Sequence, residues 1–220
     1  MTARRVLTHT TGLPNWRGPF EALRAGGWNV KSSAERLSFE RDPGTFGYSG
    51  EGFELLLHAI CERRRLRAGD LLEPHLEHLG MRGSSFVWQR SFADCVAIPH
   101  QTDGSALEKQ RPGTPRAAGT LHTTVSDYAA FATRVLAQGS DDIFEPSVVL
   151  DETHGRSLGW GTIGTPDGVV AWQHGDNLGF KHLVALRRDA GDGVVILTNG
   201  DNGHADCRGR CREVLGVAPW

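Results

Sequence analysis

The sequence predicts an α+β fold in which helices precede an antiparallel sheet. One helical face is indicated by apolar residues at one-turn intervals: Phe53, Leu56, Leu57 and Ile60. The last third changes character, with short apolar runs separated by Gly, Asp and Pro turns. These runs cover residues 158–163, 169–173, 181–188 and 193–198. Helices first and strands later favour the α+β class, with helices flanking the sheet.

Composition bounds the classes of function. The chain has 220 residues, 39% hydrophobic and 23% charged, which is typical of a globular protein and excludes general disorder. The net charge of −2 provides no field that would recruit nucleic acid or an anionic membrane. No apolar run has the length of a membrane span, and the first residues do not form a signal peptide. The sequence therefore predicts a cytoplasmic protein with no nucleic-acid and no membrane partner.

The first half of the chain is expected to be mainly helical. Residues Val6 to Trp16 are typical of a helix end that runs into a loop, because hydroxyl side chains, Gly and Pro follow a short apolar stretch. Short helical pieces are predicted over residues 17–41. A helix begins at Glu51, and a second amphipathic helix covers Asp70 to Leu79.

The second half combines a long connection, one strong helix and the strands. Residues 81–119 are irregular, and a connection of this length is uncommon unless it is functional, so we expect it to line a cleft. Thr124 and Asp127 form a predicted capping box ahead of an apolar helix. Residues 194–197 show no alternation, which predicts a strand covered on both faces. A helix over 205–215 is expected to pack on this sheet.

The four cysteines indicate neither a disulfide framework nor a metal site. Cys61, Cys95, Cys207 and Cys211 are spread along the chain, as is usual in a reducing compartment. His204 lies on the same predicted helix as the last two cysteines, but three ligands without a fourth are a weak zinc signal. We therefore expect a polar terminal helix with two half-buried thiols and no bound metal.

The stretch Pro43 to Leu57 (PGTFGYSGEGFELLL) holds Tyr48 on a glycine-rich loop at the start of a helix. Two interpretations stand. The tyrosine packs at the helix entrance for structural reasons, as most tyrosines do, or the tight loop aims a titratable phenol into a cleft.

Five segments, in order, resemble a known family. They are VLTHTTGLPNW (6–16), PGTFGYSGEGFELL (43–56), LGMRGSSFVW (79–88), AGTLHTTVSDYAAF (118–131) and WQHGDNLGF…GVVILTNG (172–200). Together they are similar to the serine β-lactamase and penicillin-binding-protein-like hydrolases. The resembling branch contains class C β-lactamases, D-alanyl-D-alanine carboxypeptidases and esterases.

The resemblance implies one β-lactamase-related domain over residues 1–220. Residues 1–150 would form a mainly helical subdomain with loops, and residues 151–220 would supply sheet strands and the terminal helix. The active site would lie at the seam between these parts. The implied chemistry is acyl transfer from an amide, lactam or ester to a serine, with a small-molecule acyl substrate and no cofactor.

The resemblance also implies site residues. Tyr48 matches the family's catalytic tyrosine, and Gly50 stands where asparagine is common in its motif. The segment Gln173-His174-Gly175 lies where the third motif belongs, and either Gln173 or His174 is its first residue. His174 would be a second catalytic residue that carries a proton near neutral pH, unless it only orders the strand end. The implied substrate-binding residues are Ser49, Gly50, Gln173, Gly175, Asp176 and Asn177.

The family's nucleophile motif, Ser-x-x-Lys, does not occur in the sequence. The only lysines are Lys31, Lys109 and Lys181, and none has a serine three positions earlier. Ser49 does not replace this nucleophile, because Glu51 breaks the Gly-x-Ser-x-Gly pattern. We therefore expect the family's nucleophile helix and early strands to be missing, as in a chain truncated at its N-terminus.

Whether the chain is an enzyme thus stays open between three hypotheses. It is a fragment of a serine hydrolase, a pseudoenzyme that keeps a ligand-binding cleft, or a remote third case, a metal- or His-based hydrolase using His174, His182 and the cysteines. An upstream in-frame Ser-x-x-Lys helix in the DNA would select the first. A missing central helix would also expose apolar surface, which predicts self-association.

Overall fold

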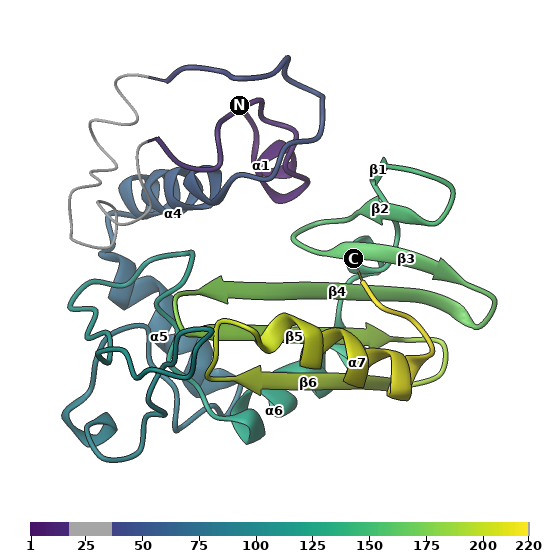
Figure 1. Ribbon diagram of the computed structural model, residues 1–220. Coiled ribbons are helices and arrows are strands. Elements are labelled where there is room, and N and C mark those ends of the chain that lie inside the picture. The colour runs from purple at the N-terminus through teal and green to yellow at the C-terminus, as the bar shows by residue number, and fades with distance from the viewer. Residues whose placement is uncertain (18–36, 220) are drawn as a thin grey trace.

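A six-stranded antiparallel sheet forms the centre of the fold in the computed structural model, which describes residues 1–17 and 37–219 (Figure 1). The strands follow one another across the sheet in chain order, so each pairs with its sequence neighbour. They are β1 (Val148–Val149), β2 (His154–Arg156), β3 (Gly161–Thr165), β4 (Gly168–Asn177), β5 (Phe180–Arg187) and β6 (Asp192–Thr198). The α+β prediction is confirmed, and β1 and β2 are strands that the sequence analysis missed.

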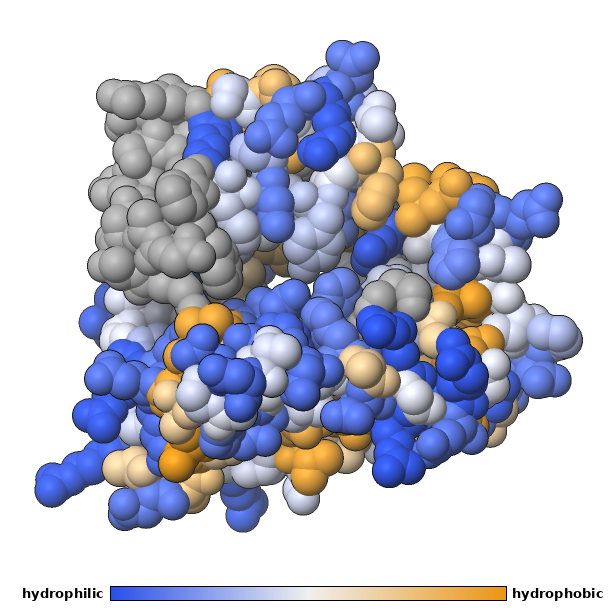
Figure 2. All heavy atoms as spheres, in the orientation of Figure 1, coloured by the Kyte–Doolittle hydropathy of each residue, from blue (hydrophilic) through white to orange (hydrophobic). Residues whose placement is uncertain are grey.

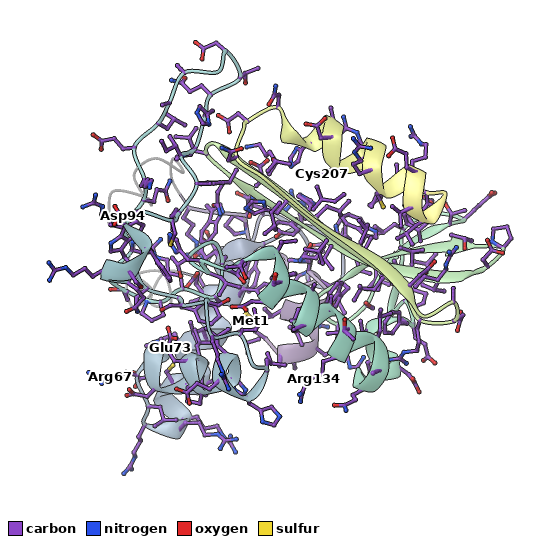
Figure 3. The ribbon with its side chains drawn as sticks, turned by 90° about the horizontal axis from the view of Figure 1, so that it is seen from below. Met1, Arg67, Glu73, Asp94, Arg134 and Cys207 are labelled. Carbon is purple, nitrogen blue, oxygen red and sulfur yellow. The ribbon has the colours of Figure 1, made fainter. Side chains whose placement is uncertain are left out.

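Two helices cover opposite faces of this sheet. Helix α7 (Gly203–Leu215) lies on one face and α6 (Val125–Gln138) on the other, as Figure 3 shows with the sheet seen nearly edge-on. The α7 side buries Trp172, Leu183 and Cys211 in one core cluster. The α6 side buries Val184 and Leu186 in a second. Val195 packs against the α6 cluster and Ile196 against the α7 cluster, which confirms the two-sided cover predicted for residues 194–197.

The other helices of the described residues lie beside the sheet. They are α1 (Ala3–Leu7), α4 (Gly50–Arg64), α5 (Ala68–His78) and the short 3-10 helices η1 (Arg90–Phe92) and η2 (Asp141–Ile143). Helix α1 ends in a loop, as predicted, and its Leu7 carbonyl accepts a hydrogen bond of 3.0 Å from the Gly159 amide before β3. The short helical pieces predicted over 17–41 lie mostly outside the described residues.

The predicted burial of α4 is partly wrong. Leu57 and Leu55 are buried, but Ile60 is exposed, whereas the carboxylates of Glu51 and Glu54 lie inside. Glu54 accepts a hydrogen bond of 2.9 Å from the Ala118 amide, and burial raises the pKa of this carboxyl. Apolar periodicity counts acidic residues as solvent-facing, so it misplaced the face.

Helix α6 begins with half of the predicted capping box. The Thr124 hydroxyl accepts from the Asp127 amide at 3.1 Å. The Asp127 carboxylate turns instead to the 81–119 connection, where it accepts from the Gly83 amide and the Ser84 hydroxyl, each at 2.8 Å. That connection is irregular, as predicted, apart from η1 and single bridges. The capping residue therefore anchors the long loop.

Helix α7 holds its cysteines in the core. Cys207, labelled on this helix in Figure 3, and Cys211 are fully buried in the cluster against the sheet, so the prediction of half-buried thiols is wrong. Among the described residues no cluster of three or more His, Cys, Asp or Glu side chains is placed to hold a metal ion. Within the same residues, no helix has the length and apolar character needed to cross a membrane.

Candidate active site

The loop that carries Tyr48 leads directly into α4. The next two residues, Ser49 and Gly50, both pack at the start of this helix. Ser49 is buried; its hydroxyl donates to the Pro14 carbonyl at 2.7 Å and accepts from the Gly52 amide at 3.0 Å. Gly50 faces the Trp16 indole, which lies 2.3 Å from where a Cβ would stand. The indole thus occupies the space that an asparagine side chain would need. Ser49 is an N-cap, and neither residue presents a side chain to a ligand.

Tyr48 stacks on His9 at the entrance to this loop. Their ring centroids are 4.2 Å apart with the planes at 27°, and Tyr48 keeps 39% of its surface exposed. Burial raises the pKa of the Tyr48 phenol, although the positive charge of Arg156 opposes this shift. The phenol is therefore neutral at pH 7 and is a hydrogen-bond donor rather than a phenolate base.

The third predicted motif lies on strand β4. Its two candidate first residues, Gln173 and His174, lie on opposite faces of the sheet. Trp172 belongs to the core cluster under α7, so His174 shares that face and Gln173 lies on the opposite one. His174 stacks on Trp172 with centroids 5.8 Å apart. The Gln173 amide donates to the Gly159 carbonyl at 3.3 Å. The pKa of His174 is lowered by burial and then by the charges of His204 and Arg156, while Asp176 opposes this.

The end of β4 is used by an ion-pair network. Asp176 binds the Lys181 ammonium at 2.8 Å, and the same ammonium contacts Asp201 at 2.8 Å and the Asn177 carbonyl at 3.0 Å. Gly175 lies opposite His182 in the β4–β5 ladder. Asp176 and Asn177 therefore brace the turn into β5.

Arg156 links the Tyr48 loop to β4, and sequence reasoning missed it. Its guanidinium carbon lies 5.1 Å from the Phe46 ring centroid and 5.0 Å from that of Trp172. We call this Phe46–Arg156–Trp172 contact the seam. Arg156 pairs with Gly161 and Gly161 with Trp172, so it stands on the same face as His174. Figure 2 shows the surface indented between the α1–α4 part and the sheet. A lone arginine in RSLGW carries no pattern that would have found it.

Within residues 1–17 and 37–219, the site offers hydrogen-bond donors and a positive charge. Of the lysines in the described residues, Lys181 is held by Asp176 and Asp201, and Lys109 donates to the Ala93 carbonyl. Ser49 is buried and doubly bonded. The arrangement can bind and polarise an anionic or carbonyl group, and it shows no serine–lysine pair for acyl transfer among these residues.

Comparisons with known proteins agree with this architecture. The family model described as Beta-lactamase matches residues 1–216. A class C β-lactamase structure superposes with a TM-score of 0.75 at 16% identity, over 91% of this chain and 64% of the other. The β-lactamase/D-alanine carboxypeptidase from Pseudomonas syringae gives 0.76 at 16% identity, over 90% and 67%. The octameric penicillin-binding protein homologue from Pyrococcus abyssi gives 0.77 at 19% identity, over 98% and 56%.

The chain therefore spans only 56% to 67% of the length of these structural relatives. A search among curated proteins returned no match. At these identities the superpositions support the fold, and the family assignment rests on the match that covers nearly every residue. This chain belongs to the β-lactamase family.

Proposed function

We propose that residues 1–220 form a ligand-binding member of the β-lactamase family that does not catalyse acyl transfer by itself. The relatives' chemistry needs a serine activated by a lysine one turn away, and the sequence contains no Ser-x-x-Lys. Under this proposal the chain keeps the seam, Tyr48 and His174 as a binding surface for a small acyl compound. It is one domain, with residues 1–150 supplying mostly helices and loops and 151–220 the sheet.

The observation that carries this proposal is the state of the Tyr48 phenol. A proton-transferring tyrosine needs a lowered pKa and a nucleophile to activate, whereas burial raises the pKa of Tyr48 and its ring partner is His9. His174 stays neutral near pH 7 because its pKa is lowered. Both groups are then neutral, and the exposed Tyr48 phenol can donate a hydrogen bond to a carbonyl or a lactam. Losing the nucleophile of such a constellation leaves only residual catalysis from binding.

The test uses a fluorescent penicillin, a fluorophosphonate probe and a chromogenic ester. We expect no covalent adduct by intact-protein mass spectrometry and no hydrolysis above the rate of a Tyr48→Phe variant. Saturable, reversible binding of the unlabelled penicillin, weakened in the His174→Ala variant, would support the ligand-binding function. Stoichiometric labelling of any serine would contradict the proposal and identify the nucleophile directly.

We also propose that the chain self-associates. Large apolar side chains reach solvent beside the sheet edge, where Val149 is 74% exposed and Leu150 is 40% exposed. The Pyrococcus abyssi relative is described as octameric. Multi-angle light scattering is expected to give a mass above 24.0 kDa at micromolar concentration. A Val149→Lys variant should lower that mass, whereas a concentration-independent monomer would argue against association.

A further inference from the structure

Arg156 is a buried cation that forms no ion pair with a carboxylate of residues 1–17 or 37–219. Only 7% of its surface is exposed, and its Nε and Nη1 atoms find no hydrogen-bond acceptor in the part of the chain that the structure describes. Arg188 provides the contrast. It also lies over an aromatic ring, 4.1 Å from the Phe144 centroid, but its guanidinium binds the Asp141 carboxylate. Arg156 has the aromatic contacts and lacks the carboxylate.

The positive charge of Arg156 affects the pKa of three neighbouring side chains. It helps to lower the pKa of His9 and of His174, and it opposes the rise in the pKa of Tyr48. Burial lowers the pKa of Arg156 itself, yet a guanidinium stays protonated in proteins. Burying such a charge costs several kcal/mol unless an anion and hydrogen bonds offset it. The nearest carboxylate on β4, Asp176, is already paired with Lys181.

His9 supplies a second buried donor beside this cation. Its Nδ1 accepts a hydrogen bond of 3.1 Å from the Ser49 amide, so the proton of the neutral ring resides on Nε2. His9 is 1% exposed, and Nε2 has no hydrogen-bond partner in the described residues. The backbone holds this orientation at a φ of 55°, a left-handed conformation that is unusual for histidine. Two independent side chains therefore present unused donors in one region.

We propose that Arg156 and His9 form a binding site for a small monocarboxylate, seated at the seam. The Nε–H and Nη1–H bonds of a guanidinium point in different directions, so one carboxylate oxygen would accept from Arg156 and the other from His9 Nε2. One cation and one neutral imidazole balance a single negative charge, whereas a phosphate dianion would leave charge uncompensated. Phe46 and Trp172 flank the guanidinium with apolar rings, so an aromatic or aliphatic acid fits better than a hydrophilic one.

Tyr48 lies on the solvent side of His9. It stacks on the His9 ring and is itself exposed, so under this proposal the anion enters beside the phenol ring. The carboxylate site is independent of acyl transfer, because neither donor is a nucleophile or an activating base. A chain that hydrolyses esters would still bind the acid, and a chain without any catalysis would do so equally.

The experiment titrates the purified 220-residue chain with sodium benzoate at pH 7 and constant ionic strength, with sodium chloride as the reference salt. Isothermal titration calorimetry is expected to show saturable binding of one benzoate per chain, accompanied by a rise in Tm that chloride does not produce. Arg156→Gln should weaken benzoate about 10- to 100-fold, as expected for charge-assisted hydrogen bonds. His9→Asn should weaken it less. Arg188→Gln, which alters the partnered arginine, should leave the Kd unchanged.

A stability measurement separates ligand binding from a merely structural role of Arg156. Without benzoate, Arg156→Gln should raise Tm, because it removes an unpaired buried charge. If that variant does not fold, the Nε–H resonance of Arg156 in the unaltered chain provides the readout and should shift on adding benzoate. Equal responses to benzoate and chloride, an unchanged Kd in Arg156→Gln or an unmoved Nε–H resonance would each overturn the proposal.

Discussion

Acidification from pH 7 to pH 4.5 is expected to destabilise the fold by about 2–3 kcal/mol through His9 alone. Burial, assisted by the charge of Arg156, lowers the pKa of His9 from 6.5 to about 3. Between pH 6.5 and about pH 3, His9 is therefore protonated in the unfolded chain but not in the folded chain. The stabilisation is complete above pH 6.5 and is lost progressively as the pH falls toward 3. Burial also lowers the pKa of His174 and His182, so their effects have the same sign.

Urea unfolding at half-unit pH steps measures this loss, and a variant isolates the share of His9. In His9→Asn the Oδ1 atom can replace Nδ1 as acceptor for the Ser49 amide, and asparagine tolerates the left-handed backbone. The variant should show a shallower slope of unfolding free energy against pH. His75→Asn, at an exposed position of α5, should keep the full slope. Parallel slopes for His9→Asn and the unaltered chain would refute the role of His9.

Replacing Arg17 by alanine is expected to cost about 3–5 kcal/mol, because it removes the guanidinium that faces a buried carboxylate. Glu51 is fully buried in the first turn of α4, and its Oε1 lies 3.1 Å from the Arg17 Nε. Its Oε2 accepts from the Arg17 amide at 3.2 Å. The hydrogen bond from the Arg17 amide to Glu51 remains in the variant, so the loss in unfolding free energy measures the contribution of the guanidinium. Chemical denaturation at pH 7 provides the measurement.

A double variant tests whether the charge is the cause. Arg17→Ala combined with Glu51→Gln should recover part of the loss, since the neutral amide is cheaper to bury than a carboxylate. The exposed Arg67–Asp70 pair at the start of α5 provides a matched comparison, and Arg67→Ala should leave the unfolding free energy unchanged within error. Full additivity of the two single variants would show that Arg17 and Glu51 do not interact.

The sequence predicted those elements whose signals are local. Helix α6 follows from periodicity within its own residues, and strand β6 and its two-sided cover follow from an uninterrupted apolar run over residues 194–197. The buried carboxylates of α4 could not be predicted this way, because their partners come from distant positions. Glu51 is paired with Arg17 and Glu54 with the Ala118 amide, 34 and 64 residues away.

The candidate site likewise contains residues that local motifs predict and residues that only the folded structure brings together. Tyr48 and His174 stand in recognisable motifs, so their positions could be proposed from sequence. Ser49 caps α4, and Asp176 pairs with Lys181. Both roles depend on the packing of the folded chain and not on a local sequence pattern. The contacts of Arg156 appear only when β3 pairs with both β2 and β4, which brings the guanidinium over the Phe46 and Trp172 rings. The two-residue β1 and three-residue β2, too short to show alternation, hid this alignment.

The two buried cysteines of α7 make it possible to measure how often this helix detaches from the sheet. Cys207 and Cys211 lie on the sheet-facing side of α7 with no exposed surface, and burial raises the pKa of both thiols. A thiol reagent can reach them only while α7 is lifted from the sheet, whereas the exposed Cys95 reacts without any such movement. The ratio of the slow to the fast alkylation rate therefore gives the fraction of time that the terminal helix spends detached.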